Sequence, residues 1–278
     1  MDDYISFKPH FRVLELLGGT GNGKTEVGTV PADQKARKIL IEGVGSTNST
    51  LTERLMVFTT EYSDKIVVAV KHDENAFSRN LFTEIISKAI AKVVKDLGKV
   101  VDTIVGKDEE ILEEALKEQL SKRNNVKAIL SLLTEEQKYA FVNDIVDLYH
   151  RYDLHQYNYN IYNTVKNEMA EVEVKENSKK FMSAIQQVVE RTMDLQSDSF
   201  KQDLWNIWES LNGDLGKVFF AHFDEQKISS DGYYYKEIML DAPDTDFINA
   251  MFTANNMQAG QRLSLEVLCS EIVIYVPM

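Results

Sequence analysis

Residues 16–27 read LLGGTGNGKTEV and contain the spacing from which the fold of this chain can be inferred. Gly18 is followed by four residues and then by Gly23, Lys24 and Thr25, which is the pattern GxxxxGK[ST]. Closely spaced glycines allow successive backbone N–H groups to turn inward and form a concave nest for an anion. A lysine at the end of such a loop can reach phosphate oxygens, and the hydroxyl after it can bind Mg²⁺. The stretch therefore predicts a phosphate-binding loop.

The flanking residues favour a strand before this loop and a helix after it. Residues 11–17, FRVLELL, combine apolar, aromatic and β-branched side chains and predict a short strand. Residues 25–27 can open a helix, whose positive dipole end would face the bound anion. Gly28 and Pro31 indicate that this helix is short or irregular.

The segment resembles the Walker A motif of the P-loop NTPases, and the whole signature is present. The resemblance implies an α/β domain with a mostly parallel sheet that binds a nucleoside triphosphate together with Mg²⁺. It also implies a set of nucleotide-binding residues, of which Thr25 would also bind the metal ion and Lys24 would act in catalysis. These residues are Gly18, Gly19, Thr20, Gly21, Asn22, Gly23, Lys24 and Thr25.

Strand patterns continue to about residue 75. Residues 37–44, 53–60 and 65–71 are rich in aliphatic and β-branched side chains and predict three strands. The turn at residues 61–64 is typical of one that joins two antiparallel strands, so we expect a hairpin there.

Helical patterns replace them over residues 75–211, where no strand pattern interrupts. Apolar residues at three- and four-residue spacing predict helices over 77–97, 108–123, 176–195 and 199–211. Another helix is predicted from Thr134, because Thr134 and Gln137 form a capping-box pattern. The Asn212-Gly213 pair predicts the end of the last helix.

Strand patterns return at residues 217–223, 233–240 and 271–276, with a short helix at 245–253. We therefore expect an α/β fold in which a P-loop NTPase sheet carries a large all-helical insertion or subdomain. Residues 1–75 and 213–278 would form the nucleotide-binding domain, and residues 76–212 the helical subdomain. The final apolar strand suggests either a piece of a longer protein, truncated at the C-terminus, or an end that pairs into a sheet.

A P-loop also needs an acidic residue at the end of a neighbouring strand, to hold Mg²⁺ or to orient the attacking water. Asp241 follows a predicted strand and opens Asp241-Ala242-Pro243-Asp244, which resembles the DxxG turn of GTPases with Asp244 in place of glycine. Asp224-Glu225 follows residues 217–223 and resembles the acidic pair of many P-loop ATPases. We favour Asp241 as the catalytic and metal-binding acid and keep Asp224-Glu225 as the alternative.

The order of loops and strands also resembles that of dynamin-like or septin-like GTPases, in which Thr47 or Thr50 would close on Mg²⁺. No N/T-K-x-D segment, the usual reader of guanine, is present. The phrase LLGGTGNGKTE also resembles that of ATPases. The choice between ATP and GTP therefore stays open.

Composition limits the classes of function. The 278 residues carry a formal net charge of −13, so we do not expect a nucleic-acid partner, because phosphate attraction needs a basic surface. The single cysteine, Cys269, excludes an intrachain disulfide and suits a cytoplasmic protein, and no transmembrane segment is expected. His150 and His155 are not four residues apart, so no structural zinc site is expected.

These observations predict a P-loop NTPase that binds and hydrolyses Mg-ATP or Mg-GTP. Its helical region would couple nucleotide state to a protein partner or to self-assembly. One alternative is a nucleotide-binding interaction module with little or no hydrolysis. Another is a small-molecule kinase, against which the scarcity of arginine in residues 76–215 argues.

Overall fold

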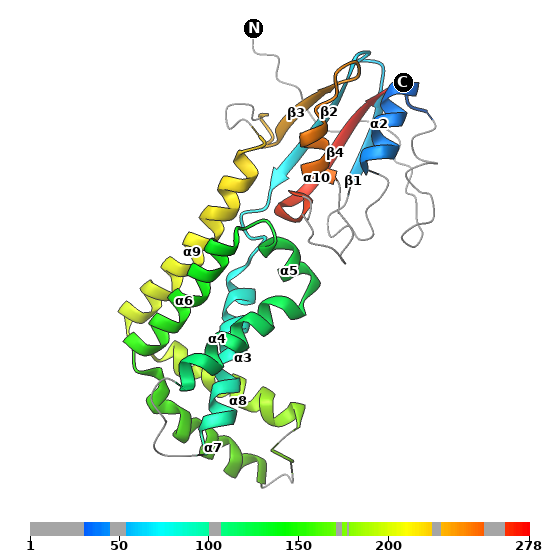
Figure 1. The fold of residues 1–278 in the computed structure, drawn as a ribbon. Helices are drawn as coiled ribbons and strands as arrows, with labels where there is room; N and C mark the ends of the chain where they lie inside the picture. The colour runs from blue at the N-terminus through cyan, green and yellow to red at the C-terminus, as the bar shows by residue number, and fades with distance from the viewer. Residues whose placement is uncertain are drawn as a thin grey trace. The chain divides into compact units, whose positions relative to one another are not determined.

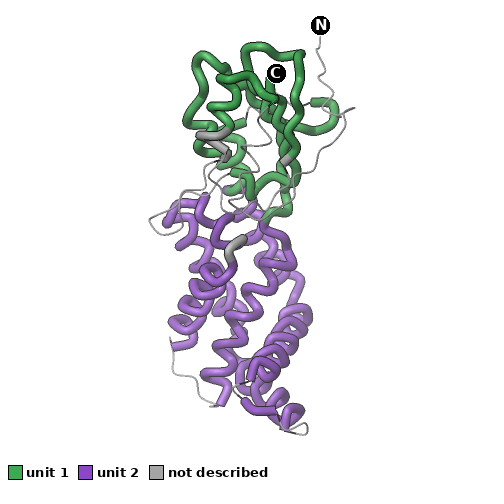
Figure 2. Tube along the Cα trace, turned by 90° about the vertical axis from the view of Figure 1, so that its right-hand side faces the viewer, with its two compact units in different colours: residues 1–76, 215–278 green, residues 77–214 purple. Residues whose placement is uncertain are grey.

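The computed structural model describes residues 31–44, 54–99, 107–170, 174–176, 178–223, 229–252 and 265–278 (Figure 1). The chain divides into two compact units, residues 1–76 with 215–278 and residues 77–214 (Figure 2). The predicted division was at residues 75/76 and 212/213. The first unit contains the described strands, and the second is built from helices.

A mixed four-stranded sheet organises the first unit, so the predicted α/β class is confirmed. The strands lie in the order β1-β4-β2-β3. Their bounds, with those of the accompanying helices, are α2 (Gln34–Val44), β1 (Arg54–Thr59), β2 (Lys65–His72), β3 (Tyr234–Met239), α10 (Thr245–Phe252), η2 (Leu265–Leu268) and β4 (Cys269–Pro277). Only β1 and β4 are parallel, and β2 is antiparallel to both of its neighbours. Among the described strands, the sheet is therefore not mostly parallel.

The two central strands are apolar on both faces. Every side chain of β2 from Ile66 to Val70 is fully buried, and β4 is buried almost throughout. Consecutive β-branched residues fit such positions, because they pack well on a pleated surface that is covered on both sides. The strand predicted at residues 271–276 thus lies in the interior of the sheet.

Aromatic side chains join β2 and β3 to the helices of the same unit. Tyr234 of β3 contacts the rings of Phe219 and Phe220 near the end of α9. Phe223 packs edge-on against Phe247 of α10, with ring centroids 5.3 Å apart. These contacts pack the end of α9 against β3 and join the residue after its final turn to α10.

The second unit contains no strand among its described residues. Its helices are α3 (Arg79–Leu97), α4 (Lys107–Lys122), α5 (Asn124–Leu130), α6 (Glu135–Arg151), η1 (Leu154–Tyr157), α7 (Asn158–Ala170), α8 (Lys179–Asp194) and most of α9 (Asp198–Phe220). The capping box at Thr134 is confirmed, with the Thr134 hydroxyl and the Gln137 side chain each accepting a backbone N–H. No described helix is both long enough and apolar enough to cross a membrane.

The strand predicted at residues 37–44 is wrong, because this segment belongs to helix α2. Ala36 and Leu40, four residues apart, are its buried positions among residues 34–40, whose side chains the structure describes. Asp33 caps the helix by accepting hydrogen bonds from the backbone N–H groups of Lys35 and Ala36. The four-residue burial period, rather than the β propensity of the isoleucines, decides the structure here.

The strand predicted at residues 217–223 and the helix end predicted at Asn212-Gly213 are also wrong. Helix α9 continues past Asn212-Gly213 and ends at Phe220, within the predicted strand. Leu211, Leu215 and Phe219 are buried at four-residue intervals, so one stripe of the helix packs into the interior. The side-chain amide of Asn212 donates to the Trp208 carbonyl within the same helix, which removes its competition with the backbone.

The hairpin predicted between the strands at 53–60 and 65–71 does not form. Both strands exist, as β1 and β2, but β4 lies between them and hydrogen-bonds to each. The short turn at residues 61–64 therefore joins strands that are separated by one strand position. Local turn chemistry alone does not reveal that a distant segment enters the sheet.

Candidate functional site

The proposed phosphate-binding loop, from Gly18 to Thr25, lies outside the residues that the structure describes, as does the strand predicted before it. Thr47 and Thr50 lie outside them as well. Asp241 and Asp244 are described, so the acidic part of the predicted site can be examined in detail.

Asp241 lies at the edge of the sheet where three strands end. Strands β1 and β4 run in the same direction, and β3 shares it because β3 and β4 are both antiparallel to β2. The Leu240 N–H donates to the Asp64 carbonyl over 2.8 Å, which ties the end of β3 to the start of β2. Asp241 therefore follows a true strand at the carboxyl edge, where α/β proteins usually bind their ligands.

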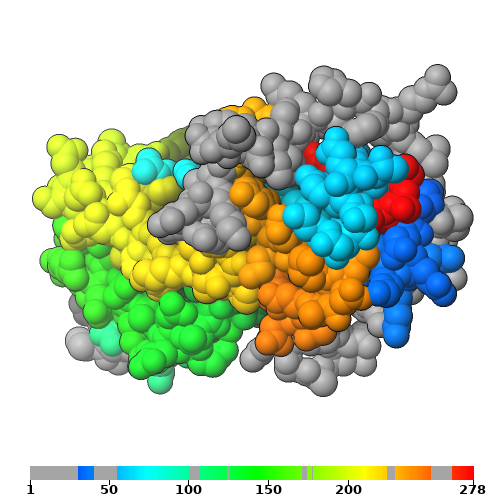
Figure 3. Space-filling model, turned by 90° about the horizontal axis from the view of Figure 1, so that it is seen from above, coloured from blue at the N-terminus to red at the C-terminus, as the bar shows by residue number. Residues whose placement is uncertain are grey.

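The amino end of helix α2 is held at the same edge. The Asp33 N–H donates to the Pro277 carbonyl at the end of β4 over 2.8 Å, and α2 begins with the next residue. Figure 3 looks onto this edge and shows α2, the C-terminal residues and residues 229–252 on one surface. A helix amino end favours anions through its free N–H groups and its dipole.

Lys35, in the first turn of α2, forms an ion pair with Asp241. Asp241 raises the pKa of the Lys35 ammonium, first through the hydrogen bond and then through its charge. The side chains are 63% and 83% exposed, respectively, so water and salt compete strongly with the pair. The Asp241 carboxylate can therefore exchange Lys35 for another cation.

Asp244 occupies the position where a GTPase would carry glycine, and its contacts are structural. Its Oδ1 accepts the Phe247 N–H over 2.9 Å at the start of α10, and its Oδ2 lies 3.5 Å from Lys236 Nζ. Aspartate is one of the residues preferred at a helix amino end, because its oxygen satisfies an unpaired N–H group. The capping of α10 accounts for an acid at this position.

The alternative acidic pair, Asp224-Glu225, lies outside the described residues. Its supposed strand, residues 217–223, consists of the end of α9 and the turn after it. The pattern of a hydrophobic strand followed by acids is therefore absent at this point, whereas Asp241 follows the described strand β3.

Two other side chains of this unit bear on the site. Cys269 is 5% exposed, and burial raises the pKa of its thiol, which makes it a poor nucleophile. Lys35 was not singled out from the sequence. No local pattern could have found it, because its partner Asp241 is 206 residues away.

Comparison with known proteins finds no family model that matches the chain, no matching curated protein and no matching solved structure.

Proposed function

We propose that this protein is a P-loop NTPase that binds and hydrolyses Mg-ATP or Mg-GTP. The complete GxxxxGK[ST] pattern from Gly18 to Thr25 is the observation that carries the proposal. The position of Asp241 supports it, because an exposed carboxylate at the carboxyl edge is where such a site requires an acid.

Each of these residues has a distinct role in phosphoryl transfer. Backbone N–H groups from Gly18 to Gly23 cradle the phosphates, and Lys24 neutralises charge on the γ-phosphate. Thr25 and Asp241 hold Mg²⁺, an ion that prefers oxygen ligands and keeps several waters. The metal ion, when bound, withdraws charge from the phosphate oxygens. The helical region couples nucleotide state to partner binding or self-assembly.

The first experiment compares Lys24→Ala with the native chain in nucleotide binding and phosphate release. We expect the variant to lose both, because the lysine contacts the nucleotide in the ground state and stabilises charge during transfer. Lys117→Ala is the matched control, since Lys117 is an exposed lysine of α4 paired only with Glu113 in the described part of the chain. Unchanged turnover in Lys24→Ala, with the fold intact by circular dichroism, would contradict the proposal.

The Asp241→Asn variant tests whether Asp241 acts through Mg²⁺ binding or through nucleotide binding. We expect nucleotide binding without Mg²⁺ to persist, and turnover with Mg²⁺ to fall at least about 100-fold, since the metal loses an anionic ligand. If turnover is retained, Asp241 is not the metal-holding acid. Competition between labelled and unlabelled ATP and GTP, run on the same samples, determines the base.

A second candidate function is a nucleotide-binding interaction module with little hydrolysis. Asp244 favours it, because the position that would present a glycine N–H to the γ-phosphate in a GTPase instead caps α10. Tight nucleotide binding with phosphate release no faster than in buffer would support this candidate over the hydrolase.

A further inference from the structure

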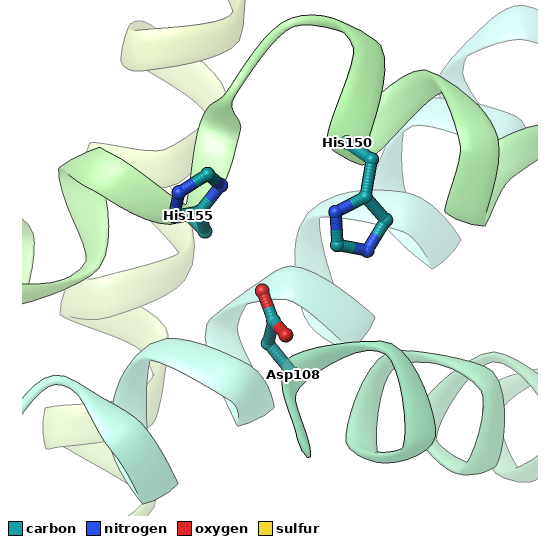
Figure 4. A group of neighbouring side chains, drawn as sticks. All are labelled: Asp108, His150 and His155. Carbon is teal, nitrogen blue, oxygen red and sulfur yellow. The ribbon is translucent and has the colours of Figure 1, made fainter. Parts of the chain in front are cut away.

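The helical unit brings together one carboxylate and two imidazoles that lie on three different elements. Asp108, His150 and His155 each offer one ligand atom, and these atoms all lie within 4.8 Å of one another. Figure 4 shows the Asp108 carboxylate pointing towards the space between the two imidazole rings. We propose that these three residues form a binding site for a divalent transition-metal ion of the zinc class.

Three different elements position the ligands. Asp108 is the second residue of α4, and His150 is the second-last residue of α6. His155 lies in η1, which follows a tight turn at Asp153, a residue with a left-handed backbone (φ 49°). The Asp153 N–H donates to the His150 carbonyl over 2.9 Å, which folds the chain back and brings the two rings to a centroid distance of 6.4 Å.

This turn explains why histidine spacing alone gave the opposite expectation. The rule of four-residue spacing applies to two ligands on one continuous helix. Here α6 ends at Arg151 before η1 begins, so a spacing of five residues still places both imidazoles on one site. The third ligand comes from α4, which no local pattern connects with α6.

Burial and hydrogen bonding also point to a cation. Asp108 is 4% exposed, and no described residue supplies a lysine or arginine ion pair to it. His155 Nδ1 is buried and has no hydrogen-bond partner among the residues that the structure describes. A buried carboxylate and a buried unpaired ring nitrogen are both costly unless they are compensated. A metal ion bound between them would compensate both.

Glu109 lies close to His150. Its Oε1 lies 3.2 Å from His150 Nε2, but this buried nitrogen has no hydrogen-bond partner among the described residues. Asp108, His150 and His155 are therefore the ligands in this proposal, and Glu109 is a neighbouring carboxylate that does not hydrogen-bond to them in the described structure.

The chemistry of the ligands selects the class of ion. Imidazole suits zinc, iron, nickel and copper, whereas Mg²⁺ and Ca²⁺ prefer sites made only of oxygen atoms. Metal–ligand bonds of about 2.0–2.2 Å place two ligand atoms about 3–4 Å apart, so only a small contraction is needed. Three protein ligands leave at least one coordination position for water or another ligand.

The test is a titration of the chelator-treated full chain with Zn²⁺, in excess Mg²⁺ to saturate sites made only of oxygen. We expect one zinc ion to bind per chain. When Co²⁺ is added in place of zinc, we expect it to bind at the same site and to show the absorption spectrum of a site with nitrogen ligands. His155→Ala and the nearly isosteric Asp108→Asn should each weaken zinc binding at least about 100-fold, because each removes a ligand. Both variants are checked for folding by circular dichroism.

Glu135→Gln is the control, because Glu135 is a 91% exposed carboxylate of α6 away from the three ligands. It should leave zinc binding unchanged. The proposal is overturned if the native chain binds no stoichiometric zinc. It is also overturned if folded Asp108→Asn and His155→Ala bind zinc as tightly as Glu135→Gln does.

Discussion

Gly98 ends helix α3 at a point where a second helix of the same unit comes very close. A Cβ added there would lie 2.6 Å from Tyr162 Cβ and 2.8 Å from the Asn158 carbonyl oxygen, and would also clash with the Val94 carbonyl. Two of these three neighbours are backbone atoms, which cannot move without shifting a helix. The absence of a side chain at this position therefore permits α3 and α7 to pack closely.

Gly98→Ala should destabilise the protein by about 1–3 kcal/mol through overpacking. Gly213→Ala is the matched change, because Gly213 is exposed within α9 and has no atom within 4 Å of an added Cβ. It should stabilise by about 0.5–1 kcal/mol, since alanine loses less backbone entropy in a helix. Urea unfolding of both variants checks the pair, and effects of equal sign would contradict the packing argument.

At the scale of elements, a charged contact joins α3 to the start of α5. Both guanidinium Nη atoms of Arg123 donate to the carboxylate of Glu84, one of them over 2.9 Å, and Lys88 Nζ donates to Glu84 over 2.6 Å. The Arg123 hydrogen bonds, followed by those of Lys88, hold the pKa of Glu84 at about 2. A carboxylate whose pKa is lowered by folding stabilises the folded state above its unfolded pKa.

This stabilisation should be fully present above pH about 4.5 and should be lost as the pH falls towards about 2. Because the Glu84 side chain is 36% exposed, solvent screening reduces its contribution to roughly 1 kcal/mol. Glu84→Gln should therefore be less stable than the native chain at pH 7, with the difference vanishing near pH 2. Denaturant unfolding across this range, with Arg123→Ala and the double variant, isolates the pair. A difference that is constant with pH would show that the carboxylate charge is not responsible.

At the scale of the whole molecule, charge and burial together determine which partners the surface attracts. The net charge of −13 repels a phosphate backbone. Residues 149–162 are rich in tyrosine, a residue on which nucleic-acid bases can stack, but Tyr149 and Tyr162 are only 1% and 2% exposed. Both are therefore part of the helical core and do not form a stacking platform.

We predict that the full chain does not bind single-stranded DNA or RNA at physiological salt. Fluorescence anisotropy with labelled oligonucleotides measures this directly, and lowering the salt should reveal no strong, salt-dependent binding of the kind that basic surfaces give. Micromolar binding at physiological salt would contradict the prediction and would require a local basic surface.

The sequence alone determined the features that depend on near neighbours. Helix α3, the capping box of α6 and strands β2 and β4 follow from periodicity, caps and β-branched runs, which act over a few residues. The Walker A pattern is likewise local, so the sequence predicts a phosphate site in residues that the structure does not describe. These features are determined by interactions between residues that are close in the sequence.

Only the tertiary structure decided the features that depend on contacts between distant segments. It turned residues 37–44 and 217–220 into helix, because buried stripes at four-residue spacing outweighed β propensity. It placed β4 between β1 and β2, paired Asp241 with Lys35 and gathered Asp108 with two histidines. Such contacts depend on the burial and hydrogen bonding of the whole unit. Interactions between residues close in the sequence do not distinguish them from competing pairings.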